Sequence, residues 1–386
     1  MLDDMSKNKT SIAIAGAGIG GLTAALTLHA AGFDVTVLES AREVKPLGVG
    51  INMLPHAVGV LTELGLGAQL DQMGIATTEI RFCDKRGTVL YTEPRGLAGD
   101  YPYPQYSVHR GILQRTLLDA VLEHLGPQSV RTNCRVRGFS QDESGVRVRT
   151  ADNEFDAAVL IGADGVNSAI RAQLHPVDPL RWAGVRMWRG ASDIGTFLTG
   201  KTMIAAHDDT DHELIAYPIS ERTVNWVALA RTDDAGELPA GARWNDPVSA
   251  DEVLDHFPGW DFGWLDIKTM IRGTDHIVEY PMVDRDPLPR WGEGRVTLLG
   301  DAAHPMYPLG ANGGSQSVVD AHVLAQALGD HPGQGLVQGL DAYEAQRIEA
   351  THNVVLANRA MLQSWGEESS AELEKVARSY RQRTRA

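Results

Sequence analysis

Three glycines and one glutamate near the start of the chain have the types and spacing of a nucleotide-binding turn. Gly16, Gly18 and Gly21 follow the apolar residues 11–15, and Glu39 ends a second apolar run about 20 residues later. In such a turn the first glycine makes the bend, the second lets the backbone approach a pyrophosphate, and the third lets a helix pack closely on a strand. Glu39 can accept hydrogen bonds from both ribose hydroxyls. The pattern predicts a dinucleotide site, although a chain with 40 glycines can also place this spacing in a structural turn.

Two later stretches separate FAD from NAD. Residues 159–171, VLIGADGVNSAIR, combine an apolar strand with Asp164, and residues 296–321 combine an apolar strand with Asp301 and a Gly-rich loop over 310–314. An aspartate at the carboxyl end of a strand suits a hydrogen bond to a polyol hydroxyl, and bare loop amides at a helix start suit a negative flavin edge. An NAD dehydrogenase does not need the second stretch, so the sequence favours FAD.

The surrounding residues predict the elements that must position these groups. Residues 11–40 favour a strand, a turn, a helix and a strand, and residues 111–125 have the apolar periodicity of a helix. Residues 79–93 favour a hairpin. Short alternating strands between 176 and 280 are typical of an antiparallel sheet with one covered face, and α/β character returns after them.

We therefore expect a mixed α/β fold in which a Rossmann-like FAD-binding domain carries an inserted antiparallel β-sheet substrate domain and ends in C-terminal helices. The expected pieces are 1–75, 100–175 and 281–365 for the FAD-binding domain, 76–99 and 176–280 for the substrate domain, and 366–386 for a surface helix.

Composition narrows the class of protein. A net charge of −15 disfavours a nucleic-acid partner, and no apolar run approaches the roughly 18 residues of a membrane helix. Cys83 and Cys134 have no metal-binding spacing, so we expect no metal site and two reduced thiols in a cytoplasmic protein. The sequence leaves monomer and homodimer open.

The three ordered motifs, GxGxxG with Glu39, GADG at 162–165 and GDAAHP at 300–305, resemble those of the class A flavoprotein monooxygenases of the p-hydroxybenzoate hydroxylase fold. The resemblance runs from about residue 11 to 360. Stretches such as PLGVGINMLPHAV, YPQYSVHRG, MWRG and MYPLGANGGSQ are most similar to members that act on phenazine carboxylates.

The resemblance implies a set of FAD contacts spread along the chain. These are Gly16, Gly18, Gly20, Gly21, Glu39, Ser40, Arg42, Gly50, Ile51, Arg110, Asp164, Asp301, Pro308, Gly310, Ala311, Asn312 and Gly313. Many relatives have Gly-Gln-Gly where this chain has GANGG, so the loop can hold the flavin differently.

The resemblance also implies the reaction. NADH or NADPH would bind transiently and reduce the flavin, and O2 would then give a flavin 4a-hydroperoxide that hydroxylates an aromatic or N-heteroaromatic acid, with or without loss of its carboxylate. The alternative is an FAD oxidoreductase of the same fold that does not insert oxygen.

Several side chains are candidates for contact with a flat aromatic substrate. They are Trp188, Met203, Tyr217, Trp226 and Tyr307, and the alternative for the aromatic ones is core packing of the β domain. Among these we expect a catalytic role most for Tyr217 and Tyr307. His304 is a further catalytic candidate, although a histidine at a strand-to-loop corner can also be structural.

Overall fold

A computed structural model describes residues 10–45, 48–363, 375 and 378–379 of the chain. One half of the molecule, built from segments far apart in the sequence, centres on a five-stranded parallel sheet of order β20-β12-β1-β2-β8. These strands are β1 (Ser11–Ala15), β2 (Asp34–Leu38), β8 (Val130–Arg131), β12 (Val159–Gly162) and β20 (Val296–Leu298). Their short, almost uninterrupted apolar runs are those of strands covered on both faces.

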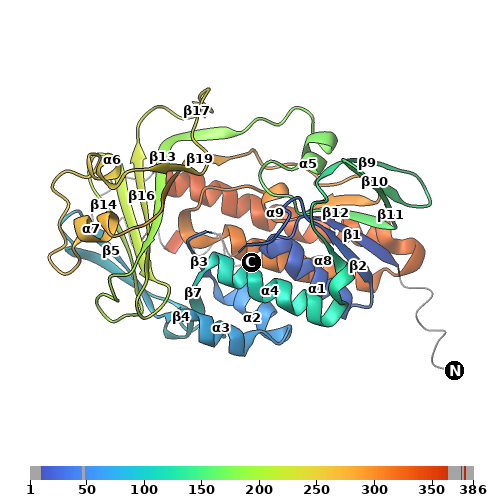
Figure 1. The fold of residues 1–386 in the computed structure, drawn as a ribbon, viewed down its shortest axis with the longest axis horizontal. Helices are drawn as coiled ribbons and strands as arrows, with labels where there is room; N and C mark the ends of the chain where they lie inside the picture. Colours follow the sequence, from blue (N-terminus) through green and yellow to red (C-terminus); the bar gives the residue numbers. More distant parts are fainter. Residues whose placement is uncertain (1–9, 46–47, 364–374, 376–377, 380–386) are drawn as a thin grey trace.

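Helices cover one face of the parallel sheet, and a small antiparallel sheet of order β11-β10-β9 lies over the other (Figure 1). The hydroxyl of Thr27 donates to the carbonyl of Ala321 at 2.9 Å, which ties the first helix to the eighth. The elements are α1 (Ile19–Ala30), α2 (Pro55–Glu63), α3 (Gly67–Met73), α4 (Arg110–Leu125), α5 (Ala169–Leu174), α8 (Gly313–Asp330), β9 (Val136–Gln141), β10 (Val146–Thr150) and β11 (Glu154–Ala157).

A nine-stranded sheet forms the other half of the molecule, on the left of Figure 1. Its order is β18-β19-β13-β16-β15-β14-β5-β6, with β17 paired to β13, and only the β14–β5 pair is parallel. The strands are β5 (Glu79–Asp84), β6 (Val89–Pro94), β13 (Arg181–Ser192), β14 (Thr202–His207), β15 (His212–Pro218), β16 (Val224–Arg231), β17 (Gly236–Glu237), β18 (Asp246–Val248) and β19 (Ile277–Asp284). The hairpin β5–β6, far upstream in sequence, thus joins the inserted strands in one sheet.

The two faces of this sheet have different neighbours. Helices α6 (Ala250–Leu254) and α7 (Ile267–Arg272) lie on the outer side, where Trp188 and Trp226 pack with Met270. The inner face looks toward the parallel-sheet half, with a second three-stranded sheet, β3-β7-β4, between them. Its strands are β3 (Gly50–Met53), β4 (Gly74–Thr77) and β7 (Gln105–His109).

The long helix α9 (Leu336–Gln363) connects the two halves. The hydroxyl of Tyr343 near its start donates to the carbonyl of Leu298 in the parallel sheet at 3.1 Å, and Leu362 at its end packs with Val185 and Met187 of the nine-stranded sheet. The mixed α/β architecture with C-terminal helices is confirmed. The surface helix expected over 366–386 lies almost wholly outside the described residues. No helix in the described part of the chain has the length and apolar character to cross a membrane.

Candidate active site

The first turn after β1 has the geometry that its glycines predict. Gly16 has a φ of +106°, and its N–H donates to the carbonyl of Leu38 at 2.8 Å. A Cβ at Gly16 would lie 2.4 Å from the Ala163 carbonyl oxygen, and a Cβ at Gly21 would lie 2.1 Å from the Gly16 oxygen, so neither position accommodates a side chain. A Cβ at Gly18 would meet no atom within 4 Å. Two glycines are therefore required by packing, and the third leaves open space.

Glu39 stands at the edge of that space. Its carboxylate accepts hydrogen bonds from the N–H of Ala17 at 2.8 Å, from the N–H of Ala41 at 2.6 Å and from the hydroxyl of Ser40 at 3.1 Å. The cavity beside it has about 820 Å³ of empty space, counting the part that is open to solvent. Its lining includes Gly16, Gly18, Glu39, Ser40, Gln114, Arg135 and Asp164. We call this space the nucleotide cavity.

Asp164 forms the opposite wall of the nucleotide cavity. Its carboxylate accepts from the hydroxyl of Ser168 at 2.5 Å and from the N–H of Ala169 at 2.8 Å, at the start of α5. Burial raises the pKa of Asp164, although these hydrogen bonds oppose the shift. The side chain is thus fixed in place by the helix that it caps.

A second polar feature lies where β20 ends. Asp301 is exposed, and its carboxylate accepts no hydrogen bond from the described residues. One of its oxygens lies 3.7 Å from the place of a Cβ on Gly313, the first residue of α8. Positive φ angles at Gly310 (67°) and Ala311 (60°) bend the preceding loop, and no side chain caps the N-terminus of α8. The N–H groups of this helix start are available to an anionic ligand edge.

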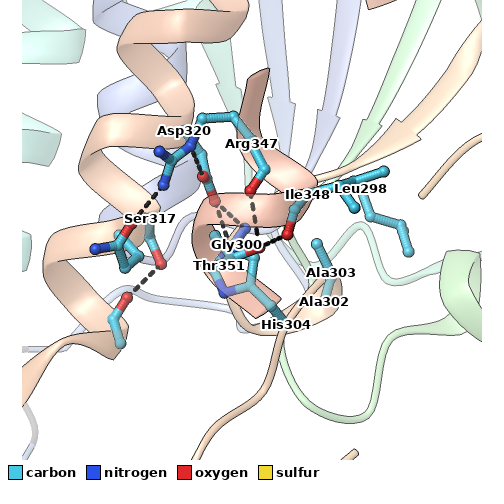
Figure 2. A network of polar contacts seen from close by, with 12 residues as sticks. Leu298, Gly300, Ala302, Ala303, His304, Ser317, Asp320, Arg347, Ile348 and Thr351 are labelled. Atoms are coloured by element: carbon cyan, nitrogen blue, oxygen red, sulfur yellow. Dashed lines mark hydrogen bonds and ion pairs between the residues drawn. The ribbon is translucent and has the colours of Figure 1, made fainter. Parts of the chain in front are cut away.

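Behind this helix start lies a buried ionic network, shown in Figure 2. Asp320 on α8 accepts from His304 Nε2 at 2.6 Å, from Arg347 Nε at 2.8 Å and from the Gly300 N–H at 3.1 Å. Burial opposes ionisation of Asp320, but the charges of His304 and Arg347 lower its pKa. The network joins α8 and α9 to the loop that carries Asp301. His304, a catalytic candidate from the sequence, is buried and packs on Trp291. Its hydrogen bond to Asp320 makes it part of the network that holds this loop.

A second cavity lies between the inner face of the nine-stranded sheet and the loop Leu309–Ala311. It has about 620 Å³ of empty space, again including its opening, and we call it the substrate cavity. Most of its wall is apolar: Leu54, Ile80, Phe82, Met203, Ala205, Ile215, Leu309 and Met361. The polar side chains that line it are Glu93, Arg95, Gln105 and Glu213. An apolar space with a few polar groups is typical of a small-molecule site.

Strand register decides which predicted aromatics reach this cavity. Met203 lies opposite Ile80, and both line it, because alternate residues of adjacent strands share one face. Trp188 and Trp226 belong to the other face and are fully buried against α6 and α7. The structure therefore brings Met203, but neither tryptophan, to the substrate cavity.

The two tyrosines lie near the cavity without lining it. Tyr217 is buried on the inner face, where burial raises its pKa to about 12 and the charge of Arg189 opposes the shift. Tyr307 is buried with Leu309 and Leu362 in the contact between sheet and α9, and burial raises its pKa to about 12 as well. Both phenols stay neutral at physiological pH.

Comparisons with known proteins agree with these features. The family described as "FAD binding domain" matches residues 9–358. The chain belongs to that family. It is 50% identical over 367 residues to the "Phenazine 1,6-dicarboxylic acid hydroxylase PhzS" of Lysobacter antibioticus, covering 91% of this chain and 89% of the relative. It is 32% identical over 366 residues to "3-hydroxybenzoate 6-hydroxylase 1" of Aquipseudomonas alcaligenes, covering 90% and 88%.

Among solved structures, Klebsiella pneumoniae HpxO complexed with FAD and uric acid matches at a TM-score of 0.79 and 25% identity, covering 96% of each chain. Membership of the FAD binding domain family and these relatives make this chain an FAD-dependent class A flavoprotein monooxygenase of the aromatic hydroxylase type. NADH or NADPH is the reductant typical of this family.

The chain's own residues fit FAD. Gly18 leaves room where a pyrophosphate needs close backbone approach, Asp301 is a carboxylate without a protein donor, and the start of α8 is uncapped. Asn312 is buried, and its side-chain amide donates to the Gly310 carbonyl at 3.3 Å, which stiffens the loop where GANGG replaces the commoner Gly-Gln-Gly.

Other residues assigned from the sequence take mixed positions. Gly50 donates its N–H to Asn225 Oδ1 at 2.6 Å, and Ile51 Cδ1 lies 2.7 Å from the place of a Cβ on Gly314. Gly20 lies where a Cβ would be 2.7 Å from Leu299, so its smallness serves helix packing. Pro308 is exposed next to the loop Leu309–Ala311.

Three arginines have different surroundings: Arg110 and Arg42, which the sequence assigned to FAD, and Arg135, which it did not. Arg110 begins α4, and its side chain runs past Gly48 at 3.7–3.9 Å from the place of a Cβ there. Arg42 is exposed and does not line the nucleotide cavity, whereas Arg135, which sequence reasoning missed, does.

Sequence reasoning also missed two charged residues on the inner face of the sheet, Arg189 and Glu213. Within the described part of the chain, the Arg189 Nε has no hydrogen-bond partner. Burial lowers the pKa of this guanidinium, and the nearby charge of Arg110 adds to the shift. Both residues occupy inward positions of alternating strands. A charge at an inward position was the signal in the sequence that could have found them.

Proposed function

We propose that this chain hydroxylates a flat, nitrogen-containing aromatic carboxylate of the phenazine type, using NADH or NADPH and O2, with or without loss of a carboxylate. The substrate cavity carries the proposal, because it is a largely apolar space between the sheet and the loop Leu309–Ala311. The 50% identity to a hydroxylase named for phenazine 1,6-dicarboxylic acid supports this substrate class.

FAD, when bound, supplies the electron transfer and the activation of oxygen. On the nucleotide side, we propose that Gly18 admits the pyrophosphate, Glu39 receives the ribose hydroxyls and Asp164 supports the same region. Asp301 would accept from the ribityl chain, and the N–H groups at Gly313 and beyond would face the anionic edge of the ring. Arg110 would contribute a cation near Gly48.

The substrate cavity orients the ring and keeps it dry. Apolar walls such as Phe82, Met203 and Ile215 exclude water from the reacting face. Arg95 lines the cavity with its Nε unsatisfied, and a guanidinium is the group suited to bind a carboxylate. Tyr217 and Tyr307 would be neutral phenols beside the site, since burial raises the pKa of each to about 12.

Oxygen incorporation tests the proposal. Purified holoprotein is supplied with phenazine-1-carboxylate, NADH or NADPH, and ¹⁸O₂, and the product is analysed by mass spectrometry. We expect one ¹⁸O atom in the product and reductant oxidation that depends on the phenazine. Oxidation of the reductant with no labelled product from any aromatic acid would favour the alternative, an FAD oxidoreductase that does not insert oxygen.

We further propose that the protein works in the cytoplasm as a monomer or homodimer. Both cysteines, Cys83 and Cys134, are unpaired thiols, which fits a reducing compartment. Light scattering on the purified holoprotein distinguishes the two oligomeric states.

A further inference from the structure

One carboxyl group in the substrate cavity has no partner. Glu213 projects from β15 into the wall of the cavity, and its buried Oε2 atom has no hydrogen-bond donor among the residues that the structure describes. An unpaired buried polar atom is costly to folding, and an unpaired buried charge costs more. A ligand that completes this group would remove that cost.

Several elements around the cavity bring side chains toward Glu213. His207 of β14 lies opposite it in the sheet register, and Leu229 of β16 lies opposite it on the other side. Loop Leu309–Ala311 and Met361 of α9 bring only apolar side chains or backbone. The charged groups across the cavity are Arg95 and Glu93, which form their own ion pair at 3.3 Å.

These surroundings favour the protonated form of the Glu213 carboxyl. Burial raises the pKa of its carboxyl to about 8. With this pKa the protonated form, which carries an O–H donor, predominates at pH 7, in a cavity whose other polar side chains are Glu93, Arg95 and Gln105.

We propose that Glu213, as the neutral acid, donates a hydrogen bond to a ring nitrogen of the bound aromatic, and so makes the site selective for nitrogen heterocycles over carbocycles. A substrate carboxylate has a better partner in Arg95, which leaves the ring nitrogen as the acceptor for Glu213. The proposal rests on the proposed function, since it concerns the same cavity.

Ligand binding to the holoprotein tests this assignment without turnover. Equilibrium dialysis compares phenazine-1-carboxylate with anthracene-1-carboxylate, which has the same shape without ring nitrogens. In the wild type we expect the phenazine to bind more tightly. Glu213→Leu should weaken phenazine binding by about tenfold and leave anthracene binding unchanged, whereas Glu213→Gln, which keeps a donor, should retain most of the affinity.

The pH dependence gives a second, independent readout. Between pH 7.5 and 9.5, above the usual range of histidine titration, wild-type affinity for the phenazine should fall as the acid ionises, and Glu213→Gln should show a flat profile. Glu237→Gln, on the exposed strand β17, is the matched control and should behave as wild type. FAD content confirms that each variant is folded.

Two results would overturn the assignment: equal losses for both ligands in Glu213→Leu, or a flat wild-type profile between pH 7.5 and 9.5. Failure of the proposed function looks different, because then neither aromatic acid binds the wild-type holoprotein. Tight phenazine binding with no effect of Glu213→Leu would reject the role of Glu213 and leave the proposed function standing.

Discussion

Two carboxyl groups, the buried Asp320 on the cofactor side and the half-buried Glu213 on the substrate side, have opposite surroundings. Asp320 has three donors within 3.1 Å, and its pKa is lowered. Glu213 has a buried oxygen with no donor, and its pKa is raised to about 8. The Asp320 network is completed by the protein itself. Glu213 instead leaves a polar atom open, as expected where a ligand must supply the missing contact.

The largest effect should come from removing the paired carboxylate, Asp320. Asp320→Asn leaves Arg347 and His304 buried without a carboxylate and should lower the free energy of unfolding by about 3–5 kcal/mol. Urea unfolding at pH 7 measures it. As a control, Asp119→Asn removes an exposed partner of Arg115, an i,i+4 ion pair of 2.8 Å, and should cost under about 0.5 kcal/mol. Equal losses in the two variants would contradict the contrast.

The open space at Gly18 gives the next prediction. Gly18 has an ordinary φ of −72°, and a Cβ there would meet no atom within 4 Å, so Gly18→Ala should leave the stability of the apoprotein unchanged. The new methyl group would, however, occupy the proposed pyrophosphate position. We expect FAD affinity to fall on the order of tenfold or more, about 1.4 kcal/mol. Flavin fluorescence titration measures this, with Gly236→Ala, also open, as control. Unchanged affinity would move the pyrophosphate away from Gly18.

Stability against pH compares the two carboxyls directly. Because the pKa of Glu213 is raised, its contribution is present below about pH 4.3, the ordinary value for glutamate, and is lost as the pH rises toward about 8. Relative to wild type, Glu213→Gln should therefore gain at least about 1.4 kcal/mol, one pKa unit, between pH 5 and 8. The contribution of Asp320 has the opposite sign, being lost as the pH falls. A constant difference across this range in urea unfolding would show that Glu213 is ionised in the fold.

The smallest effect should come from the outer face of the sheet. Trp226→Phe lies away from the substrate cavity and should change the Kd for phenazine-1-carboxylate by less than about twofold, although it loses the hydrogen bond to Thr274. Met203→Ala removes part of the cavity wall and should weaken binding more, by about fivefold. This loss is smaller than the free energy gained by burying a whole apolar side chain. The reverse order would place the ligand on the wrong side of the sheet.

The turn after β1 could be predicted from the sequence because its requirements are local. Gly16, Gly21 and Glu39 belong to one strand–turn–helix–strand unit, so their spacing in the sequence is enough to predict how they lie. The α/β architecture followed from the same periodicities.

The substrate cavity could not be predicted in this way, because it depends on register between distant segments. The parallel pairing of β14 with the upstream β5 decides that Met203 faces inward, and the register of β13 with β16 turns Trp188 outward with Trp226. The aromatic candidates were chosen by residue type, but alternation along paired strands selects the face.

In the proposed complex, a flat nitrogen heterocycle lies in the substrate cavity between Glu213 and the loop Leu309–Ala311. A crystal structure of the holoprotein with phenazine-1-carboxylate tests it most directly. We predict density for the tricyclic ring against Phe82 and Ile215, with a ring nitrogen within hydrogen-bond distance of the Glu213 carboxyl. Density for the ligand outside this cavity, or with its carbon edge toward Glu213, would contradict the account.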